Sequence, residues 1–417
     1  MLTPTVLLAI ALAAGLYMAW NIGANDVANA MGTSVGSGAL TMRKAIVLAG
    51  IFEFCGAFFV GSNVSDTIRG GIVPAATFGA SPEMLGIGML SALLAAALWL
   101  NVATFFGQPV STTHAIIGAV IGFALVAAGP GSVRWSKTGA IAASWVISPL
   151  VGGVLAYLVY RAVRRFVLRH RHPILAARAV VPLAAGSVVC IVTLSVLYKG
   201  LPKLRLDLPL VQALPVALAA GAAAALVARL AIVRSMRDRH IRARDRNAVI
   251  ERWFGRIQPI TACYMAFAHG ANDVANAIGP LAGVVSVFSG QGTLATKTVV
   301  PPWLLALGGA GIVVGLATYG YKVIQAVGRK ITEITPTRGF AAEFGTATTV
   351  LVCSKMGLPI STTFVLVGAV MGVGIARGFA AIDLTVIRRI FTSWVITIPI
   401  SAAFAAVIYW VLMGLRG

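Results

Sequence analysis

A polar octapeptide inside an apolar stretch occurs twice in the chain, and its side chains are suited to binding a cation. The sequence GANDVANA spans residues 23–30 and again residues 270–277, a displacement of 247 positions. Residues three or four apart share one face of a helix, so each copy groups one carboxylate with two amides. The groups are Asn25, Asp26 and Asn29 in the first copy and Asn272, Asp273 and Asn276 in the second. Their oxygen atoms are ligands for a hard cation, so we predict Na⁺ sites at Asp26 and Asp273.

The same octapeptide predicts a break in each helix. Glycine, asparagine and aspartate are poor helix formers, the last two because their side chains compete for backbone hydrogen bonds. Unwound carbonyl oxygens would then join the side chains as cation ligands. Alternatively, Asp26 and Asp273 only cap the broken helices. A carboxylate at membrane depth costs a few kcal/mol and an uncharged residue could cap without that cost, so we favour a direct role.

Two further acids lie inside apolar stretches, and two histidines flank the repeated motifs. Glu53 and Glu343 are predicted to contribute to cation binding, with a helix-end or ion-pair role as the alternative. His114 and His269 could relay protons or donate to an anion, or they could be satisfied histidines between helices. Both roles for the histidines are open at this point.

A second repeated segment carries hydroxyl groups. GQPVSTTHAIIGAVIG begins at Gly107, and GLPISTTFVLVGAVMG begins at Gly357. We expect the glycine to end the preceding span, the proline to begin a new helix, and the hydroxyls to occupy its first turn. The hydroxyl side chains are Ser111, Thr112, Thr113, Ser361, Thr362 and Thr363. With the N–H groups and positive dipole of a helix N-terminus, they predict an oxyanion site.

Serine and threonine also bond back to the backbone inside membrane helices, which is the alternative interpretation of this segment. The duplication of the segment, in register with the duplicated acidic motif, favours anion binding.

The elements that position these residues are predicted to form an all-α integral membrane protein. Of the 417 residues, 59% are hydrophobic and 11% are charged, and the mean hydropathy is +0.91, outside the usual range of soluble chains. A membrane span needs about 20 apolar residues. We predict about twelve transmembrane helices, near residues 4–31, 44–62, 84–106, 110–129, 138–160, 179–197, 209–233, 257–280, 302–320, 340–356, 359–376 and 386–413.

The two copies of each motif are predicted to cross the membrane in opposite directions. The first GANDVANA lies in the first predicted span and its copy in the eighth, an odd difference, and the same holds for the hydroxyl segments. Inverted-topology repeats with broken helices at the midplane build secondary transporters. We expect an N-terminal transport repeat over residues 1–160, basic loops with two linking scaffold helices over 161–256, and a C-terminal inverted repeat over 257–417.

The net charge of +21 is concentrated in arginine blocks that follow Arg161 and Arg234. A nucleic-acid or lipid-headgroup site is one interpretation, but short basic loops between apolar spans are what the positive-inside rule produces. We therefore expect these loops in the cytoplasm, both termini outside, and a multi-pass protein in a cell inner or plasma membrane. Membrane lipid is then an expected partner and nucleic acid is not.

The negative charge of an oxyanion bound beside two carboxylates must be compensated by positive charge. At an effective dielectric constant of about 20, two like unit charges about 4 Å apart cost on the order of 4 kcal/mol. The anion should therefore bind only together with cations or protons, so at least one co-transported Na⁺ or H⁺ per turnover is predicted.

At these motifs the sequence resembles the inorganic phosphate transporter family known as PiT, which has the duplicated GANDVANA signature and a duplicated P-x-S-T-T segment. The resemblance covers nearly the whole chain outside the central basic region. It implies phosphate import by symport with a cation, in an inverted-repeat protein that is commonly a homodimer. It assigns Asp26 and Asp273 to the cation and substrate site, Glu53 and Glu343 as functional acids, and the hydroxyl runs as phosphate ligands.

One residue departs from the family pattern. Phe364 stands where the family usually repeats the histidine that is present here as His114, which puts a symmetric role for His114 in doubt.

Three other functions compete with phosphate symport. Sulfate transport is the nearest, but phosphate keeps a P–OH proton that a carboxylate can accept and sulfate does not. An anion channel fits less well, because inverted broken-helix repeats with buried acids suit alternating access. An enzyme acting on phosphate esters is disfavoured because neither half shows a metal-ligand motif or a nucleophile triad. We expect no cofactor other than the co-transported ion.

Overall fold

Helices make up nearly all of the computed structural model, which describes residues 3–79, 81–105, 110–198, 208–234, 245–289, 300–321, 323–324, 335–378 and 384–416. The described residues contain no β-strand, in agreement with the predicted all-α class. The α-helices are α1 (Pro4–Gly36), α2 (Met42–Val60), α3 (Ser62–Asp66), α4 (Pro82–Phe105), α5 (Thr112–Ala128), α6 (Trp135–Val163), α7 (Pro173–Leu197), α8 (Leu210–Arg234), α9 (Arg246–Phe288), α10 (Pro302–Gly315), α12 (Pro336–Lys355), α13 (Thr362–Arg377) and α14 (Leu384–Arg416). Short π or 3₁₀ segments extend or link them: η1 (Thr67–Gly71), η2 (Ala75–Phe78), η3 (Pro130–Ser132), η4 (Arg164–Leu168) and η7 (Leu316–Gly320).

Each of the twelve predicted spans overlaps one of these helices, but not all of them are marked as spans by length and composition. Among the described residues, seven helices are long and apolar enough to cross a membrane. An eighth span results if α2 and the segment Ser62–Gly71, which is bent by 55° from it, cross together. The helices α5 and α13 are apolar but shorter. The count of twelve crossings therefore stays a prediction.

The predicted break at each GANDVANA is wrong. Both α1 and α9 run without interruption through residues 23–30 and 270–277. The asparagines were expected to compete with their own helix, but residues outside that helix accept from the amides of Asn29, Asn272 and Asn276. Asn29, for example, donates to the hydroxyl of Thr363 on α13 at 2.8 Å. Local propensity is thus overridden by contacts between helices.

The glycine of each motif serves close packing instead of breaking a helix. A Cβ atom at Gly23 would collide with the backbone oxygen of Ile312 on α10, and one at Gly270 would collide with the backbone oxygen of Glu53 on α2. Only a residue without a side chain allows the backbones to approach this closely. The two motifs therefore hold α1 against α10 and α9 against α2.

The chain breaks instead just before the hydroxyl segments. The helix α12 ends at Lys355, and Gly357 follows with φ of +68°, a left-handed value that glycine adopts without strain. This confirms the expected role of Gly357 in ending the preceding span. The equivalent Gly107 lies outside the described residues.

The proline does not begin the new helix, contrary to the prediction. Pro359 lies in an irregular stretch, and its carbonyl accepts a hydrogen bond from the Trp145 indole at 3.0 Å. The helix α13 begins at Thr362, with Ser361 as its N-cap accepting from the Phe364 N–H at 3.4 Å. Serine is a preferred N-cap because its oxygen satisfies a free N–H of the first turn.

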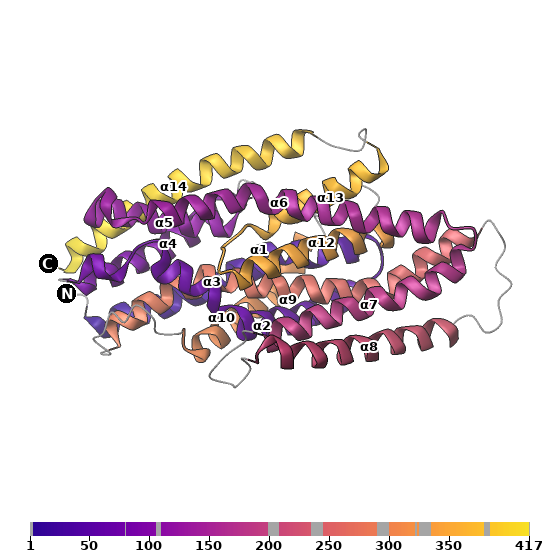
Figure 1. Ribbon diagram of the computed structural model, residues 1–417. Coiled ribbons are helices and arrows are strands. Elements are labelled where there is room, and N and C mark those ends of the chain that lie inside the picture. The colour runs from indigo at the N-terminus through magenta and orange to yellow at the C-terminus, as the bar shows by residue number, and fades with distance from the viewer. Residues whose placement is uncertain are drawn as a thin grey trace.

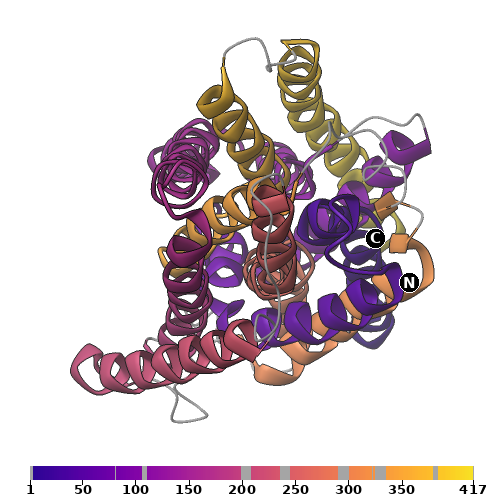
Figure 2. The ribbon, with the colours of Figure 1, turned by 90° about the vertical axis from the view of Figure 1, so that its right-hand side faces the viewer.

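The helices form an elongated bundle with both chain termini at the same end (Figure 1). The helix α9 runs through its interior, and every residue from Thr261 to Val284 is buried. It packs against α1, α2, α4 and α12. The pair α7 and α8 packs together, with α8 at the edge of the bundle, as Figures 1 and 2 show. These are the two helices expected between the repeats.

The predicted domain boundaries fall inside helices. The boundary after residue 160 lies within α6, and the boundary after residue 256 lies within α9. The reason is that the apolar spans continue as helix into the flanking basic sequence, where arginine and lysine are good helix formers.

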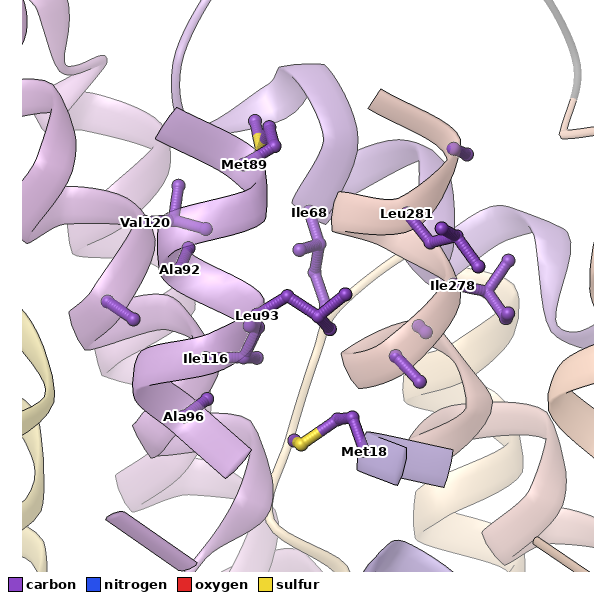
Figure 3. Packing of buried hydrophobic residues seen from close by; sticks show 14 of the residues in the cluster. Met18, Ile68, Met89, Ala92, Leu93, Ala96, Ile116, Val120, Ile278 and Leu281 are labelled. Carbon is purple, nitrogen blue, oxygen red and sulfur yellow. The ribbon is translucent and has the colours of Figure 1, made fainter. Parts of the chain in front are cut away.

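The largest apolar core fixes α1, η1, α4, α5 and α9 relative to one another. Figure 3 shows side chains from these elements converging, among them Met18, Ile68, Leu93, Ile116 and Ile278. All five are buried. Because small residues such as Ala92 and Ala96 let the helices approach, this core holds the polar residues described next at fixed positions.

Candidate functional site

The two repeated carboxylates meet at a buried centre. Asp26 on α1 and Asp273 on α9 lie with His269 so that one ligand atom from each falls within 4.8 Å of the others. His269 Nε2 is 2.9 Å from Asp273 Oδ2, and its Nδ1 is 3.1 Å from Glu53 Oε1 on α2. The side chains of His269 and Glu53 are fully buried. Three helices thus bring three acids and one imidazole together.

The hydroxyl segments reach the same centre. Ser111 and Ser361 cap α5 and α13, so the threonines after them occupy the first helical turns, as predicted. Thr362 donates to Asp273 Oδ2 at 3.0 Å, and Thr112 is hydrogen-bonded to Asp26. Each carboxylate is therefore bound by the hydroxyl of its own half of the chain.

The asparagines make the reciprocal connection between the halves. Asn29 donates to Thr363 at 2.8 Å, whereas Asn276 donates to Thr113 at 3.1 Å and to Thr112 at 3.2 Å. The N-terminal amide thus holds the C-terminal hydroxyl, and the C-terminal amide holds the N-terminal hydroxyls. The site is shared by both copies of the motif and is not repeated in each.

The remaining asparagines are not equivalent. Asn272 donates to Asp273 Oδ1 at 2.6 Å and to the backbone oxygen of Ile360 at 2.8 Å, which braces the stretch that leads into α13. Asn25 is partly exposed, and its amide donates to the Asn21 carbonyl in its own helix at 3.1 Å.

The chemistry of the centre suits a cation and an oxyanion bound side by side. The carboxylates offer oxygen ligands of the kind a hard cation prefers. The N-termini of α5 and α13 bring threonine hydroxyls and the positive ends of two helix dipoles to the same place. Burial makes each charge costly unless it is compensated by an opposite one, so a cation and an oxyanion bound there would favour each other.

Glu343 lies apart from this centre. On α12 its Oε1 accepts from Thr33 at 2.5 Å and from Ser34 at 2.6 Å, both on α1. Thr33 follows Asp26 by seven residues, about 10 Å along a helix. From α9, Thr261 donates to the other carboxylate oxygen and Gln258 donates to Oε1. The structure therefore does not bring Glu343 together with Asp26 and Asp273.

The two histidines occupy different surroundings. His269 belongs to the centre, as described above. His114 is fully buried, and its ring lies 4.0 Å from that of Trp145 and 5.1 Å from that of Phe364, measured between ring centroids. Phe364 is the residue that replaces histidine in the second copy, so the two equivalent positions are in contact.

Sequence reasoning missed several partners. The pairing of Glu53 with His269 joins residues far apart in the chain, which the sequence alone does not indicate. The spacing of four between His269 and Asp273 places them on one helix face, and this spacing was a usable signal for their contact. Gln258 and Thr261 precede the second motif by more than two turns and carried no repeat signal. Thr33 and Ser34 are two polar residues in an apolar span, and this was a weak signal for a site.

Comparison with known proteins gives concordant results. Residues 22–405 match the model of the phosphate transporter family. The chain is 44% identical over 425 residues to the Arabidopsis thaliana protein named inorganic phosphate transporter 2-1, chloroplastic, which covers 95% of this chain and 70% of that protein. It is 45% identical over 398 residues to a Haemophilus influenzae relative, covering 95% of this chain and 94% of the relative. A solved structure described as the sodium-dependent phosphate transporter is similar with a TM-score of 0.90 and 41% identity, covering 98% of this chain and 99% of that one.

Proposed function

We propose that this chain, which belongs to the phosphate transporter family, imports inorganic phosphate by symport with a cation. Na⁺ is the favoured ion and H⁺ is the alternative. The protein is a multi-pass membrane transporter and not an enzyme. The transported ion is then cargo, and no resident cofactor is required.

One observation carries the proposal: two buried carboxylates, Asp26 and Asp273, face the N-terminal turns of α5 and α13. Phosphate would bind at the hydroxyls of Thr112, Thr113, Thr362 and Thr363, with Ser111 and Ser361 shaping the turns. Cations would bind at the carboxylates with Asn29 and Asn276 nearby. A second like charge about 4 Å away costs on the order of 4 kcal/mol at an effective dielectric of about 20, so phosphate without cations would be repelled.

Na⁺ is favoured because the similar solved structure is described as sodium-dependent and shares 41% of its residues. The carboxylates and amides at the centre are hard oxygen ligands, which agrees with this choice. Glu53 and Glu343 remain proposed cation-site acids, Glu53 through His269 at the centre and Glu343 at its separate cluster.

The packing of the helices supports inverted repeats and alternating access. The contact of α1 with α10 has its counterpart in α9 with α2, and the contact of α5 with α14 has its counterpart in α13 with α6. In each of these contacts, a helix of one half packs against a helix of the other half. We propose that the transport elements that carry the shared site rock against the remaining helices and expose the site to each side in turn.

The proposed location is a cell inner or plasma membrane with both termini outside. The termini lie at the same end of the bundle, which agrees with an even number of crossings (Figure 1). A homodimer is proposed from the family resemblance.

Uptake of radiolabelled phosphate into proteoliposomes tests the function. An imposed Na⁺ gradient, an H⁺ gradient and excess sulfate are compared on the same preparation. Accumulation driven by the Na⁺ gradient and insensitive to sulfate is the expected result. Sulfate entry in place of phosphate would overturn the substrate, and unsaturable downhill flux would indicate a channel.

A further inference from the structure

An apolar groove runs along the outside of α6 and α13. It has a volume of about 620 Å³, and its walls include Leu150 and Val154 from α6 and Met371 from α13. Leu150 is 64% exposed and Val154 is 57% exposed. Along its floor the two helix backbones touch, because a Cβ atom at Gly153 would lie 2.8 Å from the backbone oxygen of Gly368. The groove is therefore lined almost wholly by carbon and faces outward from the bundle.

The length of the groove matches one leaflet of a bilayer. Along α6 its lining extends from Trp145 to Tyr157, and the twelve helical steps between them rise about 18 Å. The hydrocarbon core of a bilayer is about 30 Å thick, so one leaflet spans about 15 Å. A single extended acyl chain is of that length and chemistry.

One end of the groove is basic. Tyr157 lines the groove, and its hydroxyl accepts a hydrogen bond from Arg161 Nη1 at 2.9 Å. Arg164 donates to the Ala376 carbonyl at the end of α13 at 2.8 Å, which places the exposed Arg377 beside it. None of the ion pairs among the described residues involves these three arginines. Arg161 and Arg377 are exposed beside this end of the groove, whereas Arg164 is partly buried.

The other end of the groove lies beside the first turn of α13, which follows the hydroxyl segment of the C-terminal half. Trp145 and Phe364 line it there, and both rings contact His114. Trp145 also donates to the carbonyl of Pro359, just before the hydroxyl segment. A molecule in the groove would therefore pack against the turn that carries Thr362.

We propose that this groove binds an anionic phospholipid, with one acyl chain along α6 and α13 and the phosphate of its headgroup at Arg161 and Arg377. The positive-inside rule assigns the arginine end to the cytoplasmic side, where anionic lipids attract basic residues. A zwitterionic lipid would fill the same groove but would gain less from the arginines. A second copy of the chain, packed symmetrically about an axis along the membrane normal, would bring two arginine clusters together, which disfavours it as the occupant.

Lipid titration followed by native mass spectrometry tests the site on the full-length protein in detergent. The probes are phosphatidylglycerol and phosphatidylcholine with identical dioleoyl chains. We expect one molecule of phosphatidylglycerol to be retained with at least tenfold preference over phosphatidylcholine. Equal retention of the two lipids would overturn the role of the arginines. Phosphate uptake is not the readout, so this proposal and the proposed function fail independently.

Two pairs of matched variants locate the bound lipid. Leu150→Trp fills the groove and should lower retention of phosphatidylglycerol at least fivefold, whereas Leu158→Trp, on the same helix outside the groove and 53% exposed, should not. The double variant Arg161→Gln, Arg377→Gln should abolish the preference for phosphatidylglycerol. Arg234→Gln, an exposed arginine at the end of α8, should keep it.

Three outcomes would reject the site. One is wild-type lipid retention in Leu150→Trp. Another is an equal loss in Leu158→Trp. The third is a change from dimer to monomer in Leu150→Trp with lipid retention unaltered, which would assign the groove to a second copy. If Leu150→Trp does not fold, the double surface variant Arg161→Gln, Arg377→Gln still tests the site, because an unchanged preference for phosphatidylglycerol in that variant would reject it.

Discussion

At the scale of single residues, two copies of an identical octapeptide have become unequal through their neighbours. The position equivalent to His269 in the first copy is Ile22, and the backbone contact that Gly270 makes with Glu53 is made by Gly23 with Ile312. The pair of Glu53 and His269 in one half therefore corresponds to two buried isoleucines in the other. Asp273 has an imidazole within 2.9 Å and Asp26 has no equivalent partner at position 22, so the two carboxylates are not interchangeable.

Replacing Asp273 by asparagine should reduce Na⁺-driven phosphate uptake by about 100-fold. The change removes the negative charge that a cation requires, while the amide fills the same volume. Initial uptake rates in proteoliposomes, measured across a series of Na⁺ concentrations, check this. Asp66→Asn is the matched control, because Asp66 pairs with Arg69 at 3.3 Å outside the centre. Wild-type uptake with unchanged Na⁺ dependence in Asp273→Asn would refute the assignment.

Removing one hydroxyl should affect phosphate binding more than transport capacity. Thr362→Val keeps the shape of the side chain but loses the donor, and we expect the KM for phosphate to rise about tenfold with a smaller change in maximal rate. Thr362→Ser keeps the hydroxyl and should stay within about twofold of the wild type. A Val variant with the KM of the Ser variant would show that this hydroxyl does not contact phosphate.

At the scale of the helices, the repeated motifs act through packing as much as through chemistry. A glycine, an asparagine and an aspartate predicted a broken helix, yet α1 and α9 are continuous, with Asn29 and Asn276 donating to hydroxyls on other helices. The described breaks lie elsewhere: α12 ends at Lys355 and α13 begins at Thr362, and α5 begins at Thr112 after the non-helical residues 110 and 111. In the proposed site, the free N–H groups for the anion would come from α5 and α13, and the cation ligands would come from the uninterrupted helices α1 and α9.

Gly270→Ala should destabilise the protein. Its Cβ would meet the backbone of α2 at Glu53, which cannot move without shifting the 3.1 Å contact between Glu53 Oε1 and His269 Nδ1. Overpacking of this kind costs about 1–3 kcal/mol, and we expect the thermal unfolding temperature in detergent to fall by several degrees. Gly255→Ala on the same helix is the control, because there the nearest atom would be a Pro336 side-chain carbon at 3.5 Å. Equal melting temperatures for the two variants would contradict the close contact.

At the scale of the whole molecule, the sequence predicts the class of fold and most of the site, but not the connections between distant segments. Composition predicts helices at twelve positions, and the structure has a helix at each of them. The duplicated motifs and their spacing single out Asp26, Asp273, Thr112 and Thr362 as candidate site residues. The position of Glu343 could not be predicted. An acid in an apolar span indicates function but not where its helix places it relative to the others.

The crossed hydrogen bonds predict that neither half transports alone. Fragments 1–240 and 241–417 expressed separately should show no uptake, since Asn29 lacks Thr363 in one and Asn276 lacks Thr113 in the other. Coexpression of both fragments should restore phosphate uptake to a measurable fraction of the wild type. Uptake by either fragment alone, measured in cells with low background, would show that the site is complete within one half.

The sharing of one centre between both halves also has a consequence for biosynthesis. Chain elongation proceeds at roughly 5–20 residues per second, so the 247 residues between Asp26 and Asp273 take about 12–50 s to synthesise at that rate. Throughout this interval, a newly inserted α1 holds a carboxylate in the bilayer before α9 and α13 exist to surround it. A chain stalled within this interval therefore holds the Asp26 carboxylate without His269 and Asp273, the α9 residues that complete the buried centre in the finished protein.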